Sequence, residues 1–177
     1  LGTGRTATAI AVGQEHTCAL LDNASVKCWG LNNRGQLGLG DTNNRGDSSN
    51  EMGDNIRVVD LGSGRTAKAI AAGHAHTCAI LDNASVKCWG LNNKGQLGID
   101  SSTTMGDNSG EMAQLTGINL GTGRTATAIA TRFYHTCALL DNASVKCWGY
   151  NNKGQLGIGN TADKGDNSGE MAQLTGI

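Results

Sequence analysis

Six cysteines are the residues of this chain whose type and spacing could most readily do chemistry. They form three pairs with the same Cys-x9-Cys spacing, and such pairs can close disulfides or bind a metal ion. Each pair flanks a short polar turn, which places its members opposite each other on neighbouring strands, about 4.5–5.5 Å apart at Cβ. Regular, even-numbered cysteines are typical of an oxidising compartment. We predict an extracellular or cell-surface location and the disulfides Cys18–Cys28, Cys78–Cys88 and Cys137–Cys147.

Metal binding is the main alternative for these cysteines. His16, His76 and His135 each lie two residues before the first cysteine of a pair, so alternation along a strand puts His and Cys on one face. Zinc sites, however, usually contain tight Cys-x2–4-Cys pairs, which this chain lacks. We expect hydrogen-bonded structural histidines and no metal site, with free buried thiols as a further alternative.

Three Asn-Ala-Ser triplets match the acceptor pattern for N-linked glycans. They begin at Asn23, Asn83 and Asn142, each at the expected tip of a hairpin. A glycan at a tip would project into solvent without disturbing the strands. The alternative is a simple turn sequence, because Asn and Ser favour turns in any case. We keep these three asparagines as candidate glycosylation sites.

The remaining signals for chemistry are weaker. Gly2, Gly4 and Ala7 match a dinucleotide-binding fingerprint, but the match recurs through the chain without the helix that a βαβ unit requires. Acidic stretches at 41–54, 100–111 and 163–170 lack the spacing of a calcium loop, so we expect solvated turns there and keep calcium as an alternative. No nucleophile–base–acid set stands out. We predict no cofactor, no catalytic residue and no enzyme activity.

Composition and charge exclude further classes. The 177 residues carry a formal net charge of −1 without a basic stretch, which argues against a nucleic-acid partner. No run of 18 apolar residues is present, so no membrane span is expected. Because the chain opens at Leu1 without a signal-peptide pattern, we expect a mature form, an expression product or an excised piece.

Internal repetition sets the architecture. Residues 1–11 return at 61–71 and 120–130, and residues 16–38 return at 76–98 and 135–157 with only three varying positions. Short segments with a period of two, separated by glycines, indicate β-strands. About four short antiparallel strands per unit are typical of a propeller blade. We predict an all-β chain of three blade-type repeats, 1–60, 61–119 and 120–177, that forms an incomplete ring or part of a larger assembly.

The hairpin inside each unit can be aligned residue by residue. If Cys18 lies opposite Cys28, then Leu21 faces Ser25 and the loop is 22–24. A three-residue loop normally ends in a left-handed residue, usually glycine. Ala24 occupies that position here, as do Ala84 and Ala143 in the other units, which predicts a strained choice made three times.

The order Gly-x-x-His-Thr, hairpin, Val-x-x-Trp-Gly-x-Asn-x-x-Gly-Gln-Leu-Gly resembles the regulator-of-chromosome-condensation repeat family. The resemblance covers 13–38, 73–98 and 135–157, and so all three units. It implies a β-propeller, most often seven-bladed, in which each repeat forms one four-stranded blade. It also implies that Trp29, Gly30, Asn32 and residues 35–38, with their equivalents, are scaffold positions and not catalytic ones.

The third unit departs from this pattern. Arg132 stands where the other units have Gly13 and Gly73, and all aromatic residues other than tryptophan belong to this unit. Drift at a tolerant blade would explain the change. The functional alternative is a contact patch for a neighbour or ligand. The patch would comprise Arg132, Phe133, Tyr134 and Tyr150.

Two functions follow as hypotheses. Three blades do not close a ring, and their open edges can pair with further copies of the chain or with adjacent repeats. The first hypothesis is a non-enzymatic extracellular structural protein whose blades assemble head to tail, as a glycan-coated fibre or surface array. The alternative is a protein-binding propeller, of inhibitor or receptor-binding type, of which this chain is a fragment.

Overall fold

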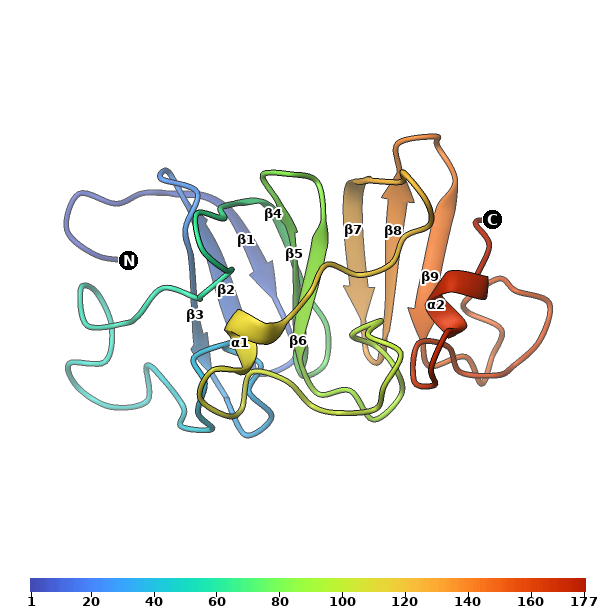
Figure 1. Cartoon of the computed structure of the whole chain (residues 1–177). Coiled ribbons are helices and arrows are strands. Elements are labelled where there is room, and N and C mark those ends of the chain that lie inside the picture. The colour runs from blue at the N-terminus through green and yellow to red at the C-terminus, as the bar shows by residue number, and fades with distance from the viewer.

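Three small antiparallel sheets stand side by side in chain order. The computed structural model describes residues 1–177, with the N-terminus beside the first sheet and the C-terminus beside the third (Figure 1). Each sheet contains three strands in sequential order. The strands are β1 (Ala7–Val12), β2 (His16–Leu21) and β3 (Val26–Gly30), then β4 (Ala67–Ala72), β5 (His76–Leu81) and β6 (Val86–Gly90), then β7 (Ala126–Arg132), β8 (His135–Leu140) and β9 (Val145–Gly149).

The expected fourth strand of each unit is reduced to isolated backbone contacts. Gly30 forms a single antiparallel bridge with Arg45, and the corresponding bridge recurs in both later units. The apolar stretch 56–59 attaches to the sheet only through the Val59 N–H, which donates to the Val26 carbonyl at 2.8 Å. Three strands per blade therefore replace the four expected, because the intervening chain runs as turns.

Two single-turn helices appear where the sequence predicted none. They are α1 (Glu111–Gln114) and α2 (Glu170–Gln173), both with the sequence Glu-Met-Ala-Gln. Ala and Gln favour helix, whereas the first unit has Gly53 and Asp54 at the matching positions, and both disfavour it. The first unit accordingly has no helix there.

The predicted hairpin register is confirmed. Cys18 pairs with Cys28, and the Leu21 N–H donates to the Ser25 carbonyl at 2.9 Å. The loop ends in left-handed Ala24, with φ of 62°, and the same conformation recurs at Ala84 and Ala143.

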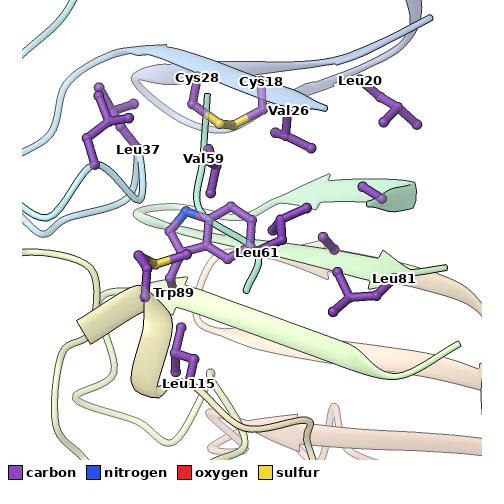
Figure 2. Packing of buried hydrophobic residues seen from close by; sticks show 14 residues of the cluster. Cys18, Leu20, Val26, Cys28, Leu37, Val59, Leu61, Leu81, Trp89 and Leu115 are labelled. Atoms are coloured by element: carbon purple, nitrogen blue, oxygen red, sulfur yellow. A yellow bond between two sulfur atoms is a disulfide. The ribbon is translucent and has the colours of Figure 1, made fainter. Parts of the chain in front are cut away.

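The hydrophobic core lies between the blades, because each three-stranded sheet is too thin to enclose one. One cluster joins Cys18, Val26 and Leu37 of the first unit to Leu81 and Trp89 of the second. Figure 2 shows the indole of Trp89 between the first unit's disulfide and Leu115. A second cluster repeats this arrangement between the second and third units, with the fully buried Trp148 in the place of Trp89.

No helix of the structure combines the length and the apolar character that crossing a membrane requires.

Candidate functional site at the open blade faces

Each blade carries one disulfide on the face that meets the next blade. The three bonds join the predicted pairs, with Cα atoms 4.0–4.1 Å apart, and no free cysteine remains. No thiolate is therefore left for metal binding, and no group of three or more acidic, His or Cys side chains is placed so that it could hold a metal ion. The first two disulfides are fully buried between blades, whereas Cys137 is partly exposed.

A histidine, a threonine and a carbonyl connect each blade to the next. His16 Nε2 lies 2.8 Å from the hydroxyl of Thr77. That hydroxyl donates its proton to the Gln36 carbonyl at 2.8 Å. It must therefore accept from the histidine, which fixes the tautomer with hydrogen on Nε2. His16 Nδ1 is buried without a partner.

The same contacts recur at the second boundary. His76 lies 3.0 Å from the Thr136 hydroxyl, which donates to the Gln96 carbonyl at 2.9 Å. The indole N–H of Trp148 donates to that same carbonyl at 3.0 Å. The first boundary has the equivalent Trp89 bond, at 3.1 Å. Two donors of one blade thus converge on one carbonyl of the preceding blade.

Burial keeps these histidines neutral. Desolvation, with a smaller contribution from His74, lowers the pKa of His16 to about 4. Complete burial, with the neighbouring histidines, lowers the pKa of His76 to about 3. Protonation would place a charge on Nδ1, which has no acceptor within the blade boundary.

Glycines make room for the close contact between blades. A Cβ on Gly38 would lie 2.7 Å from the indole nitrogen of Trp89, and a Cβ on Gly35 would lie 2.3 Å from the backbone nitrogen of Asp107. Gly98 and Gly95 repeat both contacts with the third unit. Of the scaffold glycines implied by the family pattern, Gly35 and Gly38 are therefore interface residues, whereas Gly30 packs against Glu15 and His16 of its own blade.

The third unit presents the same face to solvent. Leu139 is 39% exposed, whereas its equivalents Leu20 and Ile80 are 6% and 3% exposed. Val145 and His135 are partly exposed as well. A Cβ on Gly154 would meet nothing within 4 Å, although its equivalents Gly35 and Gly95 are pressed against the next blade.

The first unit presents the complementary face. Ile10 is 68% exposed, and Ala7 is exposed although its equivalents Ala67 and Ala126 are 3% and 4% exposed. Trp29 is partly exposed, in contrast to the two fully buried tryptophans of the later units. The two ends of the chain thus carry the two halves of the interface that the blades form internally.

The predicted contact patch lies at the third unit's open face. Its four residues, together with His135, Lys153 and Gln155, line a cavity of about 380 Å³. Phe133 is 57% exposed, and the Arg132 guanidinium lies 5.5 Å from its ring centre. Lys94 of the second unit lies 5.1 Å from the ring centre of Tyr150, so this surface continues the interface between the second and third blades.

Arginine at position 132 also changes the turn before the histidine. A Cβ on Gly13 would lie within 2.4 Å of the His16 ring, so glycine is required where the ring packs against the turn. In the third unit β7 continues through Arg132, which pairs with His135. This histidine, at the open face, is partly exposed.

The three candidate glycosylation sites lie at exposed hairpin tips. Asn23, Asn83 and Asn142 are all exposed. In each, the side-chain oxygen accepts hydrogen bonds from the N–H and the hydroxyl of the serine two residues later, at 3.2 and 2.7 Å. The glycosylation itself stays a prediction.

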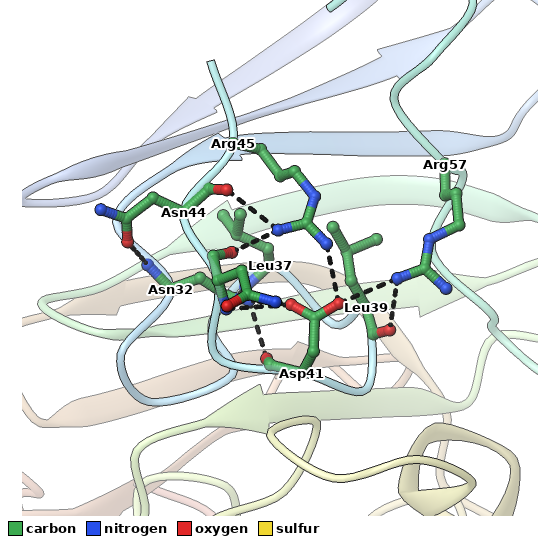
Figure 3. A network of polar contacts seen from close by, with 8 residues as sticks. Asn32, Leu37, Leu39, Asp41, Asn44, Arg45 and Arg57 are labelled. Atoms are coloured by element: carbon green, nitrogen blue, oxygen red, sulfur yellow. Dashed lines mark hydrogen bonds and ion pairs between the residues drawn. The ribbon is translucent and has the colours of Figure 1, made fainter. Parts of the chain in front are cut away.

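The acidic stretches use their carboxylates within the loops. Asp41 binds Arg45 at 2.7 Å and Arg57 at 2.9 Å, and its oxygens also accept from Asn32 (Figure 3). Glu111 accepts the backbone N–H groups of Gly106 and Asn108. These bonds join parts of the same loop, and calcium at the acidic stretches stays a prediction.

Sequence reasoning missed the contacts that join the blades. Thr77, Thr136 and the carbonyls of Gln36 and Gln96 were not singled out. The signal was the His-Thr pair and the Gly-Gln-Leu-Gly run in every unit, but one sequence does not indicate that they meet across a boundary.

Three-stranded blades, each with its own internal disulfide, pack face to face in a row. This arrangement defines a segment of a β-propeller. One model of the regulator of chromosome condensation (RCC1) repeat matches residues 7–36, 67–96 and 127–155, and a second model of that repeat matches 25–80. The chain belongs to the RCC1 repeat family.

Known proteins agree with this assignment. The ultraviolet-B receptor UVR8 of Arabidopsis thaliana is 29% identical over 87% of this chain, and the probable E3 ubiquitin-protein ligase HERC6 of Homo sapiens is 28% identical over 94%. Yeast RCC1 (Prp20), solved bound to Kap60, superposes over 90% of the chain with a TM-score of 0.67 at 20% identity, and human WBSCR16 over all of it with 0.70 at 20%. These matches span only 32% and 15% of the two sequences and 36% and 42% of the two structures.

Proposed function

We propose that this chain is a non-enzymatic structural repeat protein whose open blade faces bind further RCC1-type repeats head to tail. One observation carries the proposal: apolar residues that a neighbouring blade covers at the two internal boundaries are exposed at the chain's two ends. Leu139 is 39% exposed against 6% and 3% for Leu20 and Ile80, and Ile10 is 68% exposed whereas Ile70 and Ile129 are partly buried. Exposed apolar surface of this kind marks interaction sites. The binding partner is a repeat unit, in the same protein or another.

A binding role agrees with the kind of family the chain belongs to. Its relatives include a receptor and a GTPase regulator, the mouse X-linked retinitis pigmentosa GTPase regulator, which is 33% identical over 54% of this chain. The ligase HERC6 shares only 15% of its length with this chain, so its activity does not transfer with the match. The recurrent, buried contacts are hydrogen bonds between scaffold residues of neighbouring blades.

We further propose that the protein works in an oxidising, extracellular or cell-surface environment. Three disulfides in 177 residues support this, because such bonds persist outside the reducing cytosol. The exposed Asn23, Asn83 and Asn142 would then carry glycans on the outside of an array. The carbonyls of Ala24 and Ala84, next to two of these asparagines, accept backbone hydrogen bonds from Ala67 and Ala126 of the next blade, yet the asparagines stay exposed beside each boundary.

The test is to image the natively isolated, unreduced protein by negative-stain electron microscopy, with its mass measured by light scattering. Fibres, arrays or rings that contain further repeats are the expected result. Discrete particles of three blades, with both end faces free, would contradict the proposal.

The alternative function is a propeller fragment that binds a non-repeat protein through the contact patch. The exposed Phe133 favours it, since it also borders a second cavity of about 430 Å³ with Val12 and His74, at the turns of all three units. A photo-crosslinking residue in place of Phe133 distinguishes the two proposed functions. Crosslinks to an RCC1-type repeat support head-to-tail binding, and crosslinks to another protein support the alternative.

A further inference from the structure

We propose that the open face of the third unit is a binding site for the first unit of a second copy of this chain. This inference rests on the proposed function and names the partner. The second copy repeats the boundary already formed twice within the chain, so the third blade of one molecule continues into the first blade of the next.

The polar contacts of the internal boundaries can be completed at this joint. His135 and Gln155 are the equivalents of His16 and Gln36, which bind Thr77 of the next blade, and both residues line the open cavity. The second copy supplies Thr17 and Trp29, which are the equivalents of Thr77 and Trp89 and are both partly exposed. His135 would donate to the Thr17 hydroxyl, and the Gln155 carbonyl would accept from both residues.

A glycine lies where the tryptophan of the incoming blade would pack. At Gly38 and Gly98 a Cβ would touch the indole of the next blade, at 2.7 Å in both cases. At the equivalent Gly157 the only neighbour within 4 Å is Ile177. Ile177 holds the position of Val59, since it exchanges backbone hydrogen bonds with Val145 as Val59 bonds Val26. The side chain of Ile177, which is 62% exposed, lies 2.6 Å from the Gly157 Cβ position and would turn aside to admit the indole.

Charge at the joint favours the second copy over an unrelated blade. Lys94 of the second unit reaches across its boundary to Asp163, at 3.3 Å, and covers Tyr150 of the third. Its equivalent Lys153 has no ion-pair partner and lines the open cavity. Residue 15 of the incoming unit corresponds to Tyr134, which lies 6.4 Å from Tyr150 between ring centres. The first unit has Asn44 at the position of Asp163, so a second copy does not repeat the ion pair of Lys94, but it has Glu15 at the position of Tyr134 and so brings this carboxylate to the side of the joint where Lys153 lies.

Gly154 offers a variant that blocks the joint without disturbing the chain. A Cβ at its equivalents Gly35 and Gly95 would collide with the backbone of the next blade at 2.3 and 2.5 Å, whereas at Gly154 it meets nothing. Gly123 is the matched control. It has a similar φ, +69° against +74°, and neither it nor its equivalents Gly4 and Gly64 have a neighbour within 4 Å.

The experiment is sedimentation equilibrium of the unreduced chain over a range of concentrations. The wild type and Gly123→Ala should form dimers or longer arrays, and Gly154→Ala should lose this association with unchanged circular dichroism. Lys153→Glu should weaken association about ten-fold, as like charges meet, and the double variant Glu15→Lys/Lys153→Glu should recover it.

A wild-type chain that stays monomeric overturns the inference, as does association that Gly154→Ala leaves intact. Failure of this inference is distinguishable from failure of the proposed function. If the isolated chain is monomeric but the native preparation still forms rings or arrays with other repeats, only the proposal of a second copy as the partner is wrong. Native particles of three blades contradict both.

Discussion

The imidazole of His16 and the hydroxyl of Thr77 lie 2.8 Å apart across the boundary between the first and second blades. Because this hydroxyl donates onward to the Gln36 carbonyl, the imidazole must donate through Nε2. Burial, which lowers the pKa of His16 to about 4, keeps the ring neutral. A single pair thus fixes the tautomer of the histidine and the relative position of two blades.

Acid should destabilise the blade boundaries. Unfolded histidine has a pKa of about 6.5, whereas folded His16 and His76 have pKa values of about 4 and about 3. Between these values the unfolded chain binds more protons, so the stability is fully present above pH 6.5 and is lost as the pH falls. Each histidine should account for up to about 3 kcal/mol between pH 7 and 4. Urea unfolding at several pH values measures this.

The variant His16→Gln isolates the histidine contribution. Glutamine can still donate to Thr77 but does not titrate. Its free energy of unfolding should fall less steeply between pH 6.5 and 4 than that of the wild type. Equal slopes would show that carboxylates, and not the blade-boundary histidine, cause the acid sensitivity.

Thr77→Val should cost about 1–3 kcal/mol, because it leaves the His16 N–H buried without an acceptor. Thr17→Val is the matched control, since Thr17 occupies the same position at the open face and is partly exposed. Thermal unfolding of both variants is compared at a dilution where sedimentation shows each chain to be monomeric, so that the joint between copies, in which Thr17 takes part, does not contribute. Equal losses would contradict the role given to the boundary contact.

The three disulfides should differ in accessibility. The pairs Cys18–Cys28 and Cys78–Cys88 are fully buried, whereas Cys137 is partly exposed at the open face. Under mild reductant Cys137–Cys147 should open first, as mass spectrometry after thiol alkylation would detect. Replacing Cys78 and Cys88 by alanine should cost about 2–3 kcal/mol from the lost link, with a further loss from packing. Simultaneous reduction of all three pairs would argue against closed internal boundaries.

Ala24→Gly should stabilise the chain. Ala24 has a φ of 62°, where alanine is strained by about 1–2 kcal/mol. Glycine removes this strain, but it loses more conformational entropy on folding, which offsets part of the gain. The net gain should be about 0.5–1 kcal/mol, with the Asn-x-Ser triplet intact. Ala113→Gly in α1 is the opposite control and should destabilise by up to about 1 kcal/mol. A lower melting temperature for Ala24→Gly would show that the loop tolerates alanine without strain.

The hairpins were predictable because their determinants are local. Cysteine spacing sets the register of Cys18 against Cys28, and the loop length then forces Ala24 into the left-handed region. The repeats themselves indicated blades. Both depend on residues that are close in sequence.

The boundary between blades was not predictable in the same way. Thr77 lies 41 residues from the Gln36 carbonyl that it binds, and nothing in one sequence indicates which faces meet. The prediction of a fourth strand was wrong in the first unit because Val59 makes only one backbone hydrogen bond to the sheet, at Val26. The patch residues were singled out by type, and the structure places all four around the open cavity of the third unit.

The most direct test of head-to-tail binding is zero-length cross-linking in an equal mixture of isotope-labelled and unlabelled chain. If the third blade of one molecule binds the first blade of another, a cross-link between Glu15 and Lys153 should form in which one peptide is labelled and the other is not. Lys153 without any cross-link to Glu15 of another molecule, at concentrations where the chain is fully folded, would contradict it.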